Sequence, residues 1–269
     1  MSHLLDGCRA KLARAQETLD ALEREATKYL SQDPPLFKLE KQHRNSGLEY
    51  AFVAYGDPNP SLRFSVITGE IVHHMRSSLD HLVHALVVHN REKPTFQHQF
   101  PICITEKTFK QACERGQIKW VGATAKKLIQ SVQPFTSPAP DDTILFVVGQ
   151  YDNADKHRLL VVVTAVAHLG NMITIGSDKV IAETAERKGK VPTIIGFGDS
   201  GPKKLSSDGV IVFSIHLAEP VPELTADASI IPQLALEQCG HVKFAPLIHT
   251  LRHVLEGTRN TIELFAGEF

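Results

Sequence analysis

The stretch LRFSVITGEIVHHMRSSLDHLVHALVVHN, from Leu62 to Asn90, decides much of the fold. At 100° per residue its apolar and polar side chains separate onto two faces, which predicts one long amphipathic helix. The apolar face contains Phe64, Ile67, Ile71, Met75, Leu79, Leu82 and Leu86. The polar face contains Glu70, His73, His74, Ser77, Asp80, His81 and His84. A helix of this length must bury its apolar face along other helices, so a bundle is predicted.

Helical spacing also marks both ends of the chain. An apolar seam near the N-terminus is formed by Leu5, Cys8, Leu12, Ala15, Leu19, Leu22, Ala26 and Leu30. A second seam near the C-terminus is formed by Phe244, Ile248, Leu251, Leu255, Thr258, Ile262 and Phe265. Both have the three- and four-residue period of helices that pack along a neighbour. Shorter helices are predicted at residues 106–115, 123–132 and 141–151, where Pro and Ser separate the last two.

Several other segments have the composition of strands. Residues 36–42 and 48–55 flank Asn45-Ser46-Gly47 and predict a hairpin. Segments 172–176, 191–196 and 209–217 are rich in Ile and Val between Gly, Pro, Ser and Asp, which favours an antiparallel sheet. Periodicity does not decide whether residues 159–168 form helix or strand.

These elements predict an α+β protein, a helical bundle with an antiparallel sheet as an insertion or layer. Residues 1–158 are expected to form the bundle together with the N-terminal hairpin. Residues 159–240 are expected to form the β-rich layer, and residues 241–269 a C-terminal helix that packs on the bundle.

Composition narrows the function classes. The 269 residues are 42% hydrophobic and 22% charged, which is typical of a globular protein. The formal net charge is −1, which excludes a global basic field, so a nucleic-acid partner would need a local patch. The four cysteines lack C-x-x-C spacing and fit a reducing compartment. No apolar run approaches the roughly 20 residues of a membrane span, so a cytoplasmic protein without a membrane partner is expected.

The long helix contains Arg76 and His81, an Arg and a His separated by four residues. Here the sequence resembles the HEPN superfamily of helical nucleotide-binding and ribonuclease domains, whose motif is Arg, four to six residues, then His. The resemblance implies metal-independent RNA cleavage at a dimer interface, with Arg76 and His81 as the catalytic positions. Such a His takes a proton from the ribose 2′-hydroxyl while the Arg stabilises charge on the phosphate.

On one helix these two side chains point about 140° apart, so they would converge across two protomers rather than within one. A homodimer is therefore expected if the mechanism operates. The structural alternative for Arg76 is an ion pair with Asp80, four residues along the same helix.

A second polar segment is Asp152-Asn153-Ala154-Asp155-Lys156-His157-Arg158, which lies between apolar stretches. In one interpretation it binds phosphate or substrate through Asp155, Lys156, His157 and Arg158, with Asp155 orienting His81 or His157. In the other it is the end of a helix, where basic residues favour the carbonyl terminus. The combination of RSSLDHL with DNADKHR also resembles a widespread group of bacterial proteins, which implies no function.

A metal site is a further alternative, with His73, Asp80 and His84 on one stripe of the long helix as ligands. The leading hypothesis needs no cofactor. It is a HEPN-like ribonuclease or nucleotide-binding protein whose partner is RNA or a nucleotide. The alternative is a non-enzymatic binding or scaffold protein whose polar residues form a structural network. A nuclease requires Arg76 and His81 open to a groove, whereas a structural network requires them to be buried and hydrogen-bonded.

Overall fold

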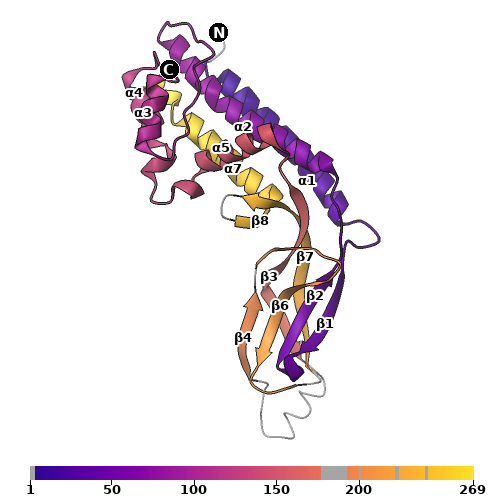
Figure 1. The fold of residues 1–269 in the computed structure, drawn as a ribbon. Helices are drawn as coiled ribbons and strands as arrows, with labels where there is room; N and C mark the ends of the chain where they lie inside the picture. The colour runs from indigo at the N-terminus through magenta and orange to yellow at the C-terminus, as the bar shows by residue number, and fades with distance from the viewer. Residues whose placement is uncertain (1–3, 177–192, 200, 222–223, 240–241) are drawn as a thin grey trace.

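A computed structural model describes residues 4–176, 193–199, 201–221, 224–239 and 242–269. The molecule is elongated, with a helical bundle at one end and two small antiparallel sheets at the other (Figure 1). The start of α1 and the C-terminus both lie at the end of the bundle farthest from the sheets (Figure 1). The α+β class predicted from the sequence is therefore confirmed.

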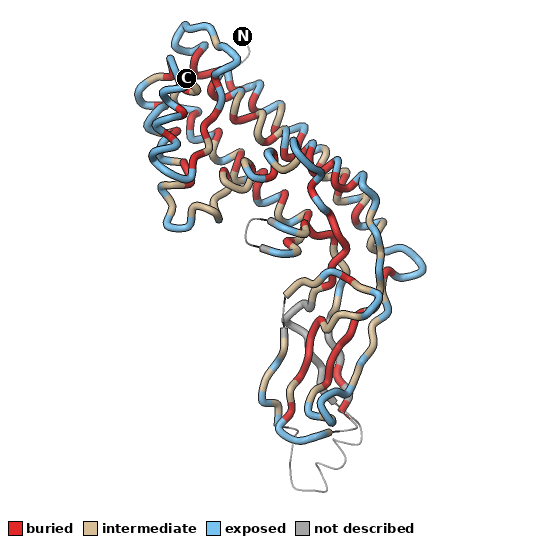
Figure 2. Tube along the Cα trace, in the orientation of Figure 1, coloured by how far each residue is buried: buried red, intermediate tan, exposed pale blue. Residues whose placement is uncertain are grey.

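The bundle is built around α2 (Leu62–His89), which packs against α1 (Asp6–Leu30), α5 (Ile144–His157) and α7 (Leu247–Glu263). The apolar residues predicted for one face of α2 are all buried, and so are the seam residues Cys8, Leu12 and Leu19 of α1. Figure 2 shows the buried positions along the facing sides of these helices. The oxygen of Ser61 accepts a hydrogen bond from the Arg63 N–H and caps the start of α2.

Two short helices, α3 (Glu106–Glu114) and α4 (Ala123–Ser131), lie beside the C-terminal end of α2, at the end of the bundle away from the sheets (Figure 1). Both were predicted within one residue of their observed bounds. Short 3-10 turns follow at Pro134–Thr136 and Pro140–Asp142. Apolar residues of this region, such as Phe109 and Ile129, join the same core as α1 and α2.

The first sheet has the order β1-β2-β6-β4, with β1 (Lys38–Arg44), β2 (Glu49–Tyr55), β6 (Val210–Leu217) and β4 (Ile194–Asp199). The predicted hairpin is confirmed, since β1 and β2 pair in antiparallel register. It extends the sheet beside β6, so the hairpin lies with the later strands in space. The predicted strand at 209–217 is β6, whereas only part of the one predicted at 191–196 lies in the described residues, where β4 begins at Ile194.

The second sheet has the order β5-β3-β7-β8, with β5 (Lys203–Lys204), β3 (Val162–Gly176), β7 (Thr225–Cys239) and β8 (Val242–Pro246). Strands β3 and β7 form a long ribbon that connects the sheets to the bundle (Figure 1). At the bundle end, Val162, Leu234 and Leu236 belong to the helical core. Apolar residues from both sheets, including Phe52, Phe213 and Ala226, share a separate small core.

Three predicted boundaries are corrected. The segment 159–168, left open between helix and strand, begins β3 at Val162, and the strand predicted at 172–176 is the continuation of β3. The helix predicted to end at residue 151 is α5, which continues to His157. Phe244, placed on the terminal helix, lies in β8 with a φ of 56°, and the helix begins after Pro246. A proline favours the first turn of a helix but cannot continue one, so it separates these two elements.

No helix in the described part of the chain is long and apolar enough to cross a membrane.

Candidate functional site

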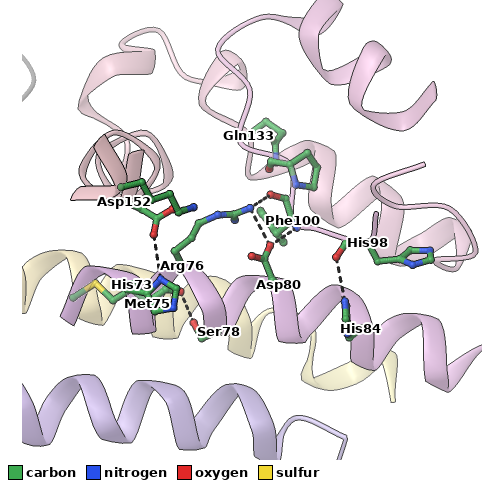
Figure 3. Close-up of polar contacts among 12 residues, drawn as sticks. His73, Met75, Arg76, Ser78, Asp80, His84, His98, Phe100, Gln133 and Asp152 are labelled. Carbon is green, nitrogen blue, oxygen red and sulfur yellow. Dashed lines mark hydrogen bonds and ion pairs between the residues drawn. The ribbon is translucent and has the colours of Figure 1, made fainter. Parts of the chain in front are cut away.

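Arg76 extends from the middle of α2 to the segment that precedes α3 (Figure 3). Its Nη2 lies 2.9 Å from Asp80 Oδ1 and donates a hydrogen bond of 2.8 Å to the carbonyl oxygen of Phe100. The Phe100 N–H in turn donates to the same Asp80 oxygen at 2.8 Å. We call this arrangement of Arg76, Asp80 and the Phe100 backbone the Arg76 clasp. It fixes an extended loop segment to a helix through one guanidinium and one carboxylate.

The clasp is largely shielded from solvent. The side chain of Arg76 is 14% exposed and that of Asp80 is 31% exposed. Burial raises the pKa of Asp80, while the Arg76 charge and the Phe100 N–H lower it. Arg76 Nη1 is buried and has no hydrogen-bond partner within the described chain. A buried ion pair of this kind depends on both partners, because removal of one leaves the other as an uncompensated charge.

His81, the second residue of the R-x4-H pair, lies on a different side of α2. It is exposed and faces α1, where a Cβ added to Gly7 would lie 3.0 Å from its Nδ1. Partial burial lowers the pKa of His81, and the charge of Lys11 lowers it further. Arg76 and His81 therefore contact different elements within one chain, as the 140° between them predicts.

The polar segment of α5 faces α2 through Asp152, which is 5% exposed. Asp152 Oδ1 lies 3.5 Å from His73 Nδ1, and its Oδ2 lies 2.6 Å from Lys156 Nζ. His73 and Lys156 remain largely open to solvent, with side chains 60% and 58% exposed. Asp152 is therefore one of the residues by which this segment contacts the long helix. The spacing of four between Asp152 and Lys156 was a signal in the sequence that could have identified the pair.

Asp155 packs directly on the backbone of α2 at Gly69. A Cβ added to Gly69 would lie 2.1 Å from Asp155 Oδ1, so only glycine permits this position of the Asp155 carboxylate. Burial raises the pKa of Asp155, as do the charges of Asp152 and Glu70, whereas His73 lowers it. The expected contact of Asp155 with His81 or His157 is replaced by this contact with Gly69.

The remaining residues proposed to bind phosphate lie at the end of α5 and just after it. Lys156 and His157 lie in the last turn of α5, where cations favour the carbonyl end of a helix. Arg158 follows the helix and lines a cavity of about 240 Å³ with Tyr151, Leu160 and Glu237. The segment is thus the end of a helix, and its binding of phosphate or substrate stays a prediction.

The three residues considered as metal ligands have separate partners. His73 contacts Asp152, and Asp80 belongs to the clasp. His84 Nε2 lies 3.2 Å from the carbonyl oxygen of His98. Within the described residues, no group of three or more His, Cys, Asp or Glu side chains is placed to hold a metal ion.

Sequence reasoning did not predict that the backbone of residues 100–103 is hydrogen-bonded by the side chains of Arg76, Asp80 and Gln133. Gln133 also holds this segment: its Oε1 accepts from the Cys103 N–H at 2.9 Å, and its Nε2 donates to the Pro101 carbonyl at 2.9 Å. These contacts join residues about 20 to 32 positions apart, so no local spacing could have revealed them.

Comparison with known proteins supplies no relative: no family model, no curated protein and no solved structure matches the chain.

Proposed function

We propose that this chain is a non-enzymatic binding protein whose buried polar residues hold its helices together. The observation that carries the proposal is the Arg76 clasp. The guanidinium that would stabilise a phosphate is directed at Asp80 and the Phe100 carbonyl, with only 14% of its side chain exposed. A group that already neutralises a partly buried carboxylate is part of the fold rather than free for substrate.

The surroundings of the clasp support the same proposal. Glu70, Asp80, Asp152 and Asp155 gather along the contact of α2 with α5, together with the cations Arg76 and Lys156. This excess of carboxylates repels a phosphate group. His73 and Lys156 are directed at Asp152, which further reduces the positive charge offered to an anion.

A HEPN-like ribonuclease, formed across a twofold axis, is the second candidate, and one observation favours it. His81 is exposed, and its lowered pKa keeps the imidazole neutral near pH 7, as a general base requires. This candidate requires Arg76 to leave Asp80 and Phe100 or to act through Nη1.

An RNA cleavage assay separates the two candidates. Purified protein is incubated with single-stranded RNA, with and without chelator, beside His81→Ala and Arg76→Met. A binding protein gives no cleavage above buffer in any sample, and Arg76→Met unfolds at a lower denaturant concentration than the parent chain. Cleavage by the parent chain that His81→Ala abolishes would overturn the proposal in favour of the ribonuclease. Cleavage abolished by chelator would instead indicate a metal-dependent activity.

A further inference from the structure

Positive charge is concentrated in residues 91–127, which we call the basic end. It contains three acidic residues, Glu92, Glu106 and Glu114, and eight cationic ones, Arg91, Lys93, Lys107, Lys110, Arg115, Lys119, Lys126 and Lys127. Its net charge is therefore +5, whereas the whole chain has −1 and the remainder −6. The basic end supplies the local patch that a nucleic-acid partner would need in a protein without a global positive field.

All eight cations of the basic end are exposed. Lys110 pairs with Glu106 at 2.9 Å, and both side chains remain more than 60% exposed. None of the other seven forms an ion pair with a described residue. The basic end includes α3 and α4, at the tip of the bundle away from the sheets (Figure 1). Unlike the cations around Asp152, these charges are not used to hold helices together.

Two aromatic side chains are exposed within the same region. Phe96 is 87% exposed, and Trp120 is 37% exposed. No aromatic ring in the described chain pairs with Phe96, and most of its surface is open to a ligand. Trp120 is partly covered, since the His98 ring lies 5.5 Å away and Lys119 Nζ lies 4.7 Å from its centroid. Phe96 is therefore the ring available for stacking, and Trp120 extends the apolar surface beside it.

The buried side chain of His98 fixes the segments that present these rings. Its Nδ1 accepts the Thr95 N–H at 2.8 Å, which assigns the proton to Nε2, and Nε2 donates to the Lys119 carbonyl at 3.0 Å. Thr95 precedes Phe96 and Lys119 precedes Trp120, so one imidazole joins both exposed rings to a common support. The rings are thus presented on an ordered surface rather than on a loose loop.

Trp120 also has an unusual backbone conformation, with a φ of 64°. A bulky residue in the left-handed region is strained and persists only where its surroundings hold it. Here Asn90 Nδ2 donates to the Trp120 carbonyl at 2.7 Å, and the His98 ring lies against the indole. Exposed rings on a fixed support, in a segment rich in exposed cations, are features of surfaces that bind a strand of phosphates and bases.

We propose that the basic end binds single-stranded nucleic acid, with Phe96 stacking on a base and Lys93, Arg115 and Lys119 contacting phosphates. This inference rests on the proposed function and names the partner of the binding protein. A single strand is favoured over a duplex because a paired base is stacked between its neighbours and is not free to cover the Phe96 ring. It is favoured over an acidic polypeptide because every nucleotide pairs a phosphate charge with a base that can stack on Phe96, whereas Asp and Glu side chains offer charge alone.

The test uses the full chain and fluorescence anisotropy of labelled oligouridylate and oligothymidylate, with a duplex of the same length and polyglutamate as competitors. Phe96→Ala is expected to weaken single-strand binding about tenfold through loss of stacking. The triple variant K93E/R115E/K119E is expected to weaken it by more than about tenfold and to reduce the slope of log affinity against log salt by about 2.

Matched controls lie at the other end of the bundle and on the sheets. Leu62→Ala removes another exposed apolar side chain, 70% exposed, at the start of α2. R24E/K28E/K243E makes the same change in net charge at three exposed positions outside the basic end. Neither control is expected to change the affinity for the single strand more than about twofold. The lower net charge of the control triple also weakens long-range attraction to the strand, but salt screens that effect. Circular dichroism of every variant confirms that it is folded.

Three outcomes overturn the inference: no binding of either single strand at low salt, equal loss in the control triple, or displacement by polyglutamate with no effect of Phe96→Ala. Binding localised to the basic end supports it. Failure here is distinguishable from failure of the proposed function, because cleavage is measured separately. A chain that neither cleaves RNA nor binds a single strand keeps the first proposal and loses the second.

Discussion

The middle of α2 and the basic end both contain charged side chains and histidines, yet they use them in opposite ways. Around Arg76, the charged groups face protein: Asp80, the Phe100 backbone and the α5 carboxylates. In the basic end, seven of eight cations lack an ion-pair partner within the described chain, and Phe96 is 87% exposed. The difference separates residues that maintain the fold from residues available to a ligand.

The two regions also differ in what a charge contributes to stability. An exposed pair such as Lys110–Glu106 contributes roughly 0.2–1 kcal/mol, because water solvates both ions well. Breaking a buried pair leaves an unsolvated charge and costs about 3–5 kcal/mol. Substitutions in the two regions are therefore expected to affect different measurements, stability in the first and binding in the second.

The largest effect is expected for Asp80→Ala. It leaves the largely buried guanidinium of Arg76 without a carboxylate and removes the acceptor of the Phe100 N–H. We expect the free energy of unfolding, measured with urea, to fall by about 3 kcal/mol.

A double-mutant cycle sharpens this prediction. Arg76→Met combined with Asp80→Leu removes both charges, so it should be less destabilising than the sum of the single variants by at least about 1 kcal/mol. Lys110→Ala, which breaks the exposed pair in the basic end, is the matched control and should cost less than about 1 kcal/mol. Additive single variants would show that Arg76 and Asp80 do not act as a unit.

A smaller loss is expected for Gly69→Ala, which tests the approach of α5 to α2. The added methyl would lie 2.1 Å from Asp155 Oδ1, so the Asp155 side chain or α5 itself must shift. Overpacking of this kind costs about 1–3 kcal/mol, measured as a lower denaturation midpoint. Removing the obstacle in Gly69→Ala/Asp155→Ala should recover part of the loss. Gly267→Ala is the control, because nothing lies within 4 Å of its added Cβ, and it should leave stability nearly unchanged.

The smallest effect is expected for Asp155→Asn, measured as a function of pH. The pKa of Asp155 is raised in the folded chain, so the folded state holds this proton more tightly than the unfolded state. The ionised form is therefore unfavourable, and stability falls as the pH rises above about 4, the ordinary value for Asp. The neutral amide removes this penalty, so the variant should be slightly more stable than the parent at pH 7 and no more stable near pH 3. A variant less stable at pH 7 would show that the Asp155 charge is favourable.

The sequence predicted the elements whose pattern is local. The apolar face of α2 is buried as expected from 100° spacing, and the β1–β2 hairpin pairs around Asn45-Ser46-Gly47. The helix predicted at residues 141–151 continues to His157, and the interpretation of residues 152–158 as the end of a helix is confirmed. Asp152, at the start of this segment, is buried, which shows that the segment continues a packed helix.

Part of the candidate site could also be predicted from the spacing of residues alone. Positions 76 and 80 are four apart, and the predicted structural alternative, an ion pair between Arg76 and Asp80, is confirmed at 2.9 Å. The catalytic role of Arg76 and His81 remains a prediction. Phe96 and the net charge of residues 91–127 could have been noticed in the sequence, but the exposure of that ring could not.

By itself, the sequence determined which residues share a helix face, where turns interrupt the chain, and how charge divides between residues 91–127 and the rest. These properties depend on the fixed geometry of a helix or turn and on simple counting. Only the tertiary structure decided that Arg76 binds the Phe100 carbonyl, that Asp155 rests on Gly69, and that His98 supports both exposed rings. Such contacts join segments distant in the chain, and burial then decides whether a charge stabilises the fold or stays free to bind.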